Sequence, residues 1–343
     1  MDELNEEAPR NGCHNCSNPE IEPGYQAPLC RDCRKKLSRY PVLTSVKLAA
    51  AGVLLLFLIS GYNFPKYFKA GVIYEKAIKA EATHHYVTEK RLLEKVLQQF
   101  PDNFEACEHY IIAAFNNVEL EEADSVIRLV AGRKNDNVEL IDKTNNIIAD
   151  FRYYMIADTA FAASLSRIPI DSPLYEQTLE KYCNNHPEDA CANYILAKHA
   201  FNNDNFSRAD SLLNKLLKSN PDFQVAKIML SHSYRKEKKF EKALQLCEEV
   251  LQQNAESYYA LASYAKILLA QQRNKEALQR AQQAYELNPH EVMTLGTLTL
   301  ANHFNDNIKE RDRLLKVLVS LPGSDSSSIA DITGIINGKI SYR

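Results

Sequence analysis

The sequence has no tryptophan and only 10 glycines among its 343 residues. Glycine-rich turns and aromatic strand segments are therefore scarce, whereas leucine, alanine, glutamate, lysine and glutamine are abundant. This composition favours an all-α fold. The net charge of -3 excludes a chain that binds nucleic acid through its overall charge.

Catalytic signatures are also missing. The sequence contains no H-E-x-x-H, no G-x-S-x-G, no Walker phosphate loop and no G-x-G-x-x-G. We therefore expect no enzyme activity. An enzyme would require a site assembled from residues that are scattered along the chain.

One uncharged run, LAAAGVLLLFLISGYNFP, extends from Leu48 to Pro65. At about 1.5 Å per residue, a helix of this length approaches the thickness of a bilayer core of about 30 Å. A cleaved signal peptide would lie nearer the start, and a buried core helix would have a polar face. We predict a transmembrane helix over residues 42–64.

The cations around this run are unevenly distributed. Because positive charge favours the cytoplasmic side, the sequence predicts a cytoplasmic N-terminus. The best match is a single-pass protein of the bacterial inner membrane, with the rest of the chain in the periplasm. The cations before or within the span are Arg31, Arg34, Lys35, Lys36, Arg39 and Lys47, and those after it are Lys66, Lys69, Lys76 and Lys79.

Four cysteines precede the span in two C-x-x-C pairs, Cys13 with Cys16 and Cys30 with Cys33. Two such pairs can supply the four thiolates of a tetrahedral Zn²⁺ site. The spacing resembles the zinc-ribbon family, and this resemblance implies a structural zinc ion over residues 13–36, after an acidic disordered leader at 1–12. Two disulfides or a redox C-x-x-C remain alternatives, although the first requires an oxidising compartment.

Small residues and prolines recur at intervals of 34 in the second half of the chain. Alanine occupies positions 209, 243 and 277, and proline precedes the corresponding segments at 187, 221 and 289. This pattern of paired helices resembles the tetratricopeptide repeat, and the resemblance implies a solenoid over residues 70–322. The clearest repeats are 101–134, 187–220, 221–254, 255–288 and 289–322.

Two segments depart from the period. Residues 135–186 are an irregular insertion, for which we expect helices near 137–150, 152–167 and 173–185. A weaker unit, with helices near 70–83 and 87–99, precedes the first clear repeat. Residues 323–343 form a C-terminal cap or tail.

In the repeat family the first helix of each unit lines a concave groove. The resemblance places apolar and cationic side chains there, which would fit a peptide with apolar anchors and acidic groups. A solvated face with incidental cations is the alternative. The candidate partner-binding residues are Tyr194, Lys198, Phe201, His232, Arg235, Tyr259 and Lys266.

Together these features predict a membrane-anchored scaffold whose repeat solenoid binds a protein or peptide partner. The alternative is a transmembrane sensor whose zinc ribbon contacts nucleic acid or a cytoplasmic partner. For that role, Arg31, Arg34, Lys35, Lys36 and Arg39 supply the positive charge, without an aromatic stacking platform.

Overall fold

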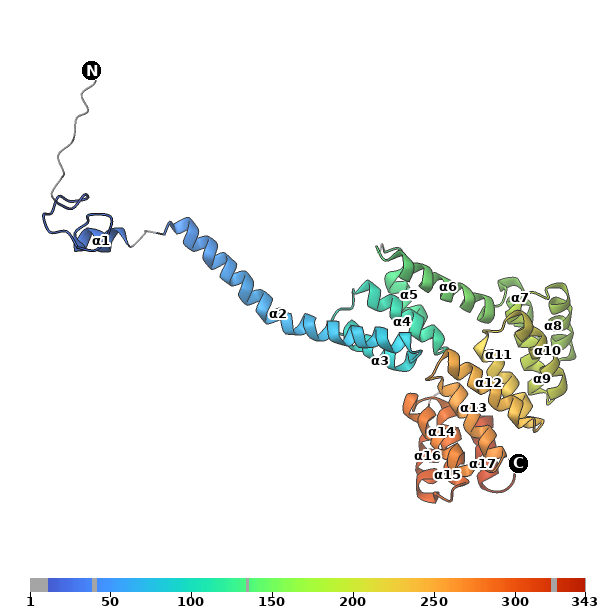
Figure 1. Ribbon diagram of the computed structural model, residues 1–343. Helices are drawn as coiled ribbons and strands as arrows, with labels where there is room; N and C mark the ends of the chain where they lie inside the picture. The colour runs from blue at the N-terminus through green and yellow to red at the C-terminus, as the bar shows by residue number, and fades with distance from the viewer. Residues whose placement is uncertain (1–11, 39–41, 134–135, 322–325, 343) are drawn as a thin grey trace. The chain divides into compact units, whose positions relative to one another are not determined.

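The computed structural model describes residues 12–38, 42–133, 136–321 and 326–342. The chain divides into two compact units, with the boundary between Phe68 and Lys69. Figure 1 shows the order of the helices in both units. The expected leader at 1–12 lies almost entirely outside the described residues.

The first unit contains the cysteine segment, followed by an apolar helix. A short helix, α1 (Arg31–Leu37), begins at the second cysteine pair. Helix α2 (Thr44–Ala82) contains the stretch Thr44–Tyr62, which is long and apolar enough to cross a membrane and is not buried by the protein. In the described part of the cysteine segment no β-strand forms, so only its cysteine spacing resembles a zinc ribbon.

The second unit is built entirely from helices in its described residues, beginning with the end of α2. Most of the helices form antiparallel pairs joined by short turns, as in a tetratricopeptide solenoid (Figure 1). The helices are α3 (Tyr86–Leu97), α4 (Phe104–Asn116), α5 (Leu120–Val130), α6 (Val138–Met155), α7 (Thr159–Leu165), α8 (Pro173–Asn185), α9 (Ala190–Asn202), α10 (Phe206–Ser219), α11 (Gln224–Lys236), α12 (Phe240–Gln253), α13 (Tyr258–Ala270), α14 (Asn274–Leu287), α15 (Val292–His303), α16 (Ile308–Ser320) and α17 (Ser326–Ile336).

The turn inside each helix pair has the same backbone conformation. One non-glycine residue in this turn adopts a positive φ. The residue that follows it donates its backbone N–H to the carbonyl of the residue five positions earlier, and this hydrogen bond closes the C-terminal end of the first helix. Successive turns of this kind are 34 residues apart, except across the insertion. The first of them lies in the weak unit that precedes the first clear repeat of the sequence. The residues are His84, Val118, Asp204, Lys238, Gln272 and Asp306.

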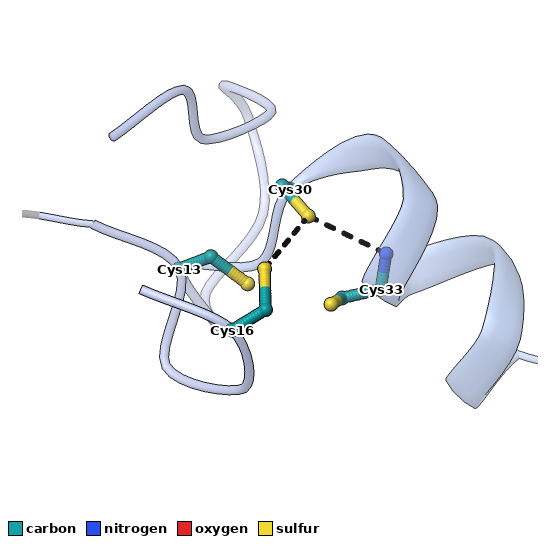
Figure 2. Close-up of side chains that lie close together, drawn as sticks. All are labelled: Cys13, Cys16, Cys30 and Cys33. Carbon is teal, nitrogen blue, oxygen red and sulfur yellow. Dashed lines mark hydrogen bonds between the residues drawn. The ribbon is translucent and has the colours of Figure 1, made fainter. Parts of the chain in front are cut away.

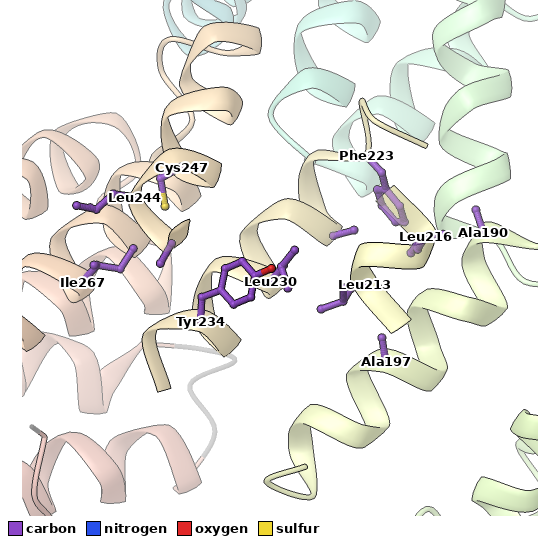
Figure 3. Packing of buried hydrophobic residues seen from close by; sticks show 12 residues of the cluster. Ala190, Ala197, Leu213, Leu216, Phe223, Leu230, Tyr234, Leu244, Cys247 and Ile267 are labelled. Atoms are coloured by element: carbon purple, nitrogen blue, oxygen red, sulfur yellow. The ribbon is translucent and has the colours of Figure 1, made fainter. Parts of the chain in front are cut away.

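Small residues allow the paired helices to approach closely. Ala209, Ala243 and Ala277 are fully buried, and Ala123 has the same burial in the earlier repeat. Around them, leucine and aromatic side chains form a series of buried clusters; Figure 3 shows one cluster, in which Leu213, Leu230 and Ile267 are fully or almost fully buried. This core packing makes each repeat depend on its neighbours.

The insertion is helical, but its boundaries differ from those expected. Helix α6 continues to Met155 instead of ending near residue 150, and α7 starts only at Thr159. Asp158 caps α7 by accepting hydrogen bonds from the N–H groups of Ala160 and Phe161. An aspartate at this position favours a new helix start, which the apolar pattern alone did not locate.

The early repeats also contact later ones directly. The N–H of Ala255 donates to the carbonyl of His84 at 2.9 Å, and the hydroxyl and N–H of Thr88 donate to the Glu256 carboxylate. Val87 joins the buried cluster around Tyr258. The array therefore folds back so that α3 packs near α12, α13 and α14, a contact between distant repeats that the repeat pattern alone did not predict.

Candidate functional site

The four N-terminal cysteines converge, as Figure 2 shows. Their sulfur atoms all lie within 4.8 Å of one another, and the Sγ atoms of Cys16 and Cys30 are 3.5 Å apart. Zinc with four sulfurs at about 2.3 Å requires sulfur–sulfur separations of about 3.8 Å. The donor set and its spacing therefore fit a zinc ion.

Local backbone structure positions these sulfurs. The N–H of Cys13 donates to the carbonyl of Asn18 at 2.7 Å, which closes the first knuckle. Cys30 lies at the N-terminus of α1, where its sulfur accepts from the N–H of Cys33 at 3.4 Å. The side-chain amide of Asn15 donates to the sulfur of Cys33 at 3.3 Å.

The thiols influence one another strongly. A backbone hydrogen bond from Cys30 is the main cause that lowers the pKa of Cys13 to about 6. The N–H of Asn18 would lower the pKa of Cys16, but contacts with the other three sulfurs raise it to about 12. Four thiolates this close together require a cation to offset their mutual repulsion. All eight cysteines of the chain are free thiols, including Cys183 and Cys191.

One member of the basic tail is engaged within the cysteine segment. Arg34 forms a 3.0 Å ion pair with Glu22, donates to the carbonyl of Ala27, and lies 3.7 Å from the ring centroid of Tyr25. Arg31, Lys35 and Lys36 remain exposed, and Arg39 lies outside the described residues. The charge available for nucleic acid is therefore smaller than the sequence predicts.

A cavity of about 650 Å³, called here the C-terminal cavity, lies beside α11, α13 and α15, the first helices of the last repeats. Arg235, Lys236 and Lys266 line it from α11 and α13, and Ile332 and Tyr342 line it from the C-terminal segment. The hydroxyl of Tyr342 donates to the carbonyl of Lys266 at 3.0 Å. A Cβ added to Gly296 would come within 2.7 Å of Ile332, so α17 packs closely on α15.

The cations of this cavity have few acidic neighbours. In the described parts of the chain neither Arg235 nor Lys266 forms an ion pair, and the Arg235 Nε is buried without a hydrogen-bond partner. Burial, followed by the nearby charges of Arg235 and Lys236, lowers the pKa of Lys266 to about 8. Among the described residues that line the cavity, Asp331 is the acidic one.

The other predicted groove residues have separate contacts. His232 is hydrogen-bonded to the Ser263 hydroxyl at 2.8 Å, and burial holds its pKa well below the usual value. The Tyr259 hydroxyl donates to Glu291, and Lys198 is exposed. The ring of Tyr194 lies 5.3 Å from Phe223, and that of Phe201 lies 5.3 Å from Phe206. Of the seven candidates, only Arg235 and Lys266 line the C-terminal cavity.

A second group of ligand-type side chains was missed at the sequence level. Glu81 from α2, Glu89 from α3 and His109 from α4 each place one potential ligand atom within 4.8 Å of the others. The His109 Nδ1 hydrogen-bonds Glu81, and Lys143 from α6 pairs with the other oxygen of Glu81.

These two carboxyl groups ionise differently. Burial, followed by a hydrogen bond with Glu81 and the Glu81 charge, raises the pKa of Glu89 to about 10. Burial would also raise the pKa of Glu81, but its hydrogen bonds with His109, Glu89 and Lys143 lower it to about 2.

The sequence does contain a signal for this group. Moving back by 34 residues from the packing position Ala123 leads to Glu89, so a carboxylate replaces the alanine of the later repeats. The first unit matches the repeat pattern weakly, so the alanine spacing of the later repeats does not by itself reveal this substitution.

Comparisons with known proteins agree with the repeat architecture. The tetratricopeptide repeat family matches residues 234–292. No curated protein sequence is similar enough to this chain to count as a match.

Several solved structures are similar at a low level. MamA from Desulfovibrio magneticus RS-1 is 18% identical, with a TM-score of 0.39 over 49% of this chain and 93% of that one. Tom70 from yeast is 15% identical, with a TM-score of 0.40 over 74% of this chain and 58% of that one. Neither neighbour identifies a ligand for this chain.

Proposed function

We propose that this protein is a membrane-anchored scaffold whose repeat unit binds an acidic peptide segment of a protein partner. The cavity beside α11 and α13 carries this proposal, because Arg235 and Lys266 lie there without ion-pair partners in the described chain. Carboxylates of a peptide would supply the missing charge, and Ile332, Ile335 and Tyr342 would contact its apolar side chains.

The anchor in this proposal is the apolar stretch of α2. Thr44–Tyr62 is exposed along its whole length, and water would solvate such a surface poorly. We propose a single span in a bacterial inner membrane, with the cysteine segment in the cytoplasm and the repeats in the periplasm. Zinc thiolates suit the reducing side, and the cation bias favours the same orientation.

Peptide binding can be tested with the full-length chain in detergent micelles. Short random peptides displayed on phage are selected on the protein, and the affinity of the enriched peptides is measured by fluorescence anisotropy. We expect peptides that combine acidic and apolar residues. Combined Arg235→Glu and Lys266→Glu substitutions should weaken binding by about 100-fold or more, since a hydrogen bond to a charged group contributes about 1.5–3 kcal/mol.

Lys218→Glu is the matched control, because Lys218 is an exposed lysine of the same unit that does not line the cavity. It should leave the affinity unchanged. If the enriched peptides bind the doubly reversed variant as tightly as the native protein, the cavity is not the binding site.

The orientation has its own test. Exposed Lys198 and Ser38 lie in the two units, on opposite sides of the apolar stretch in the sequence. In intact cells a membrane-impermeant maleimide that enters the periplasm should label Lys198→Cys and spare Ser38→Cys. The reverse pattern would show that the topology is opposite to the proposed one. Labelling of both positions would contradict the proposed membrane span.

A further inference from the structure

Glu89 occupies a position where the repeat architecture normally requires a small apolar side chain. The equivalent alanines, at 123, 209, 243 and 277, are fully buried between paired helices. Glu89 is equally inaccessible, with 0% of its surface exposed. A carboxylate buried at such a position is costly unless another group offsets its charge.

Among the described residues, no cationic side chain donates a hydrogen bond to it. Both carboxyl oxygens of Glu89 are buried, and the hydrogen bond that they make is shared with a second carboxyl group, Glu81. The charged neighbour Lys143 instead pairs with Glu81, and Lys90, adjacent in sequence, pairs with Glu119 and Glu122. The Glu89 carboxyl group therefore lacks the lysine partner that Glu81, Glu119 and Glu122 have.

The surrounding groups form a mixed oxygen and nitrogen donor set. The His109 Nδ1 lies 3.9 Å from a Glu89 oxygen and contacts Glu81. The side chains of Glu81 and His109 are only 8% and 13% exposed. The ring of Tyr74 meets the His109 ring edge-on, with centroids 5.8 Å apart, and shields it. Two carboxylates and one imidazole are ligands that first-row divalent cations accept.

We propose that Glu81, Glu89 and His109 bind a divalent transition-metal ion of the zinc class. The ion supplies the positive charge that Glu89 lacks, and it joins α2, α3 and α4. Lys143 remains compatible with the ion because it contacts the Glu81 oxygen that His109 does not. The small exposed fractions of Glu81 and His109 leave access for a water as a further ligand.

The consequence of such an ion is mechanical. Glu81 lies in the last turn of α2, the helix whose earlier part is the proposed membrane span. Binding of the ion would fasten the end of this helix to α4 of the first clear repeat. This role does not depend on what the C-terminal cavity binds.

The experiment uses the full-length chain in detergent, with Cys13, Cys16, Cys30 and Cys33 all replaced by serine to remove thiolate binding. Zn²⁺ alone is titrated by calorimetry, and thermal unfolding of the helices is followed by circular dichroism with zinc or with EDTA. We expect one bound Zn²⁺ per chain and a higher Tm with zinc. Glu89→Gln should weaken zinc binding by at least about 100-fold, because loss of an outer-sphere partner alone costs about 10–100-fold.

Glu94→Gln is the control, since it changes a half-buried carboxylate of the same helix outside the donor set. It should bind zinc as the parent does. If Glu89→Gln does not fold, His109→Gln tests the same loss at another ligand. The proposal is overturned if the cysteine-free parent binds no zinc and gains no thermal stability from it. Unchanged zinc affinity in the ligand variants would overturn it as well.

Discussion

The described residues contain two groups of side chains of the kinds that bind metal ions, and the two groups are constructed in opposite ways. The cysteine group draws all its donors from residues 13–33, on two knuckles that are close in sequence. The Glu81, Glu89 and His109 group draws its donors from three helices that pack together. The first is a local motif, whereas the second exists only once the repeats have folded.

This difference determines what an ion contributes in each case. The buried apolar cluster of the cysteine segment consists of three of the cysteines themselves, with Leu29 packed against them. Such a segment has little core of its own, so a bound metal ion would supply most of its stability. Around Glu89, by contrast, Leu93, Ala106 and Ala123 are fully buried and hold the helices together. An ion at that site would add stability to helices that already pack together without it.

The largest expected effect is loss of the cysteine segment on metal removal. Zinc binding contributes about 10–16 kcal/mol in small zinc peptides, so chelation or Cys30→Ser should unfold residues 12–38. Limited proteolysis should then cut this segment rapidly, while far-UV circular dichroism shows the repeat helices intact. Glu89→Gln provides the control, because it should leave the segment protected. Protection that survives chelation and Cys30→Ser would show that zinc does not hold the segment together.

The second prediction transfers the buried carboxylate to a repeat that lacks the other donors. Ala243→Glu places an acid at the equivalent position of α12, where Ala243 is fully buried. We expect a loss of about 3–5 kcal/mol in the free energy of unfolding, measured in urea, because the charge would be uncompensated.

Ala243→Ser is the matched control and should cost less, since it adds a hydroxyl instead of a charge. A loss below about 1 kcal/mol for Ala243→Glu would be smaller than the usual cost of burying an unpaired polar group. The packing position would then tolerate a carboxylate by itself, and the contrast between the first repeat and the later ones would disappear.

The contrast between the two groups also explains which features of the molecule could be predicted from the sequence. Cys13 and Cys33 are close in the chain, so their spacing carries the geometry of the site. The 34-residue period likewise predicts helix pairs, because each pair packs by the same small residues. Glu81 and His109 are brought together by packing of three helices, and no spacing rule relates them. The contact of His84 with Ala255 depends on the path of the irregular insertion, which has no period to extend.

The third prediction concerns the cations of the C-terminal cavity, another site assembled by folding. The pKa of Lys266 is lowered to about 8, so this lysine loses its charge as the pH rises through that value. Affinity for the selected acidic peptides should fall between pH 7 and pH 9, as measured by anisotropy. Lys266→Arg should remove this pH dependence, because arginine stays protonated. An equal fall in affinity for the arginine variant would exclude Lys266 as its cause.

The lowered pKa of Lys266 also determines whether the free energy of unfolding rises or falls with pH. The folded pKa of Lys266 is below its ordinary value of 10.5, so the unfolded chain binds more protons between these two pH values. Stability should therefore rise with pH across this window as far as Lys266 is concerned. Chemical unfolding of the native protein and of Lys266→Arg, compared at pH 8 and pH 10, measures that contribution as the difference between them.

The smallest expected effect tests a local feature, the turn inside each helix pair. Val118 adopts a φ of 63° there, which is unfavourable for a β-branched residue. Val118→Gly relieves a strain of about 1–2 kcal/mol, partly offset by the greater flexibility of glycine in the unfolded chain. We expect a net gain of about 0.5–1 kcal/mol in urea unfolding. Asp204→Gly, at the equivalent turn, should gain less, because aspartate adopts this conformation more readily. Equal gains at both turns would mean that the backbone conformation alone, without the β-branched side chain, determines the strain.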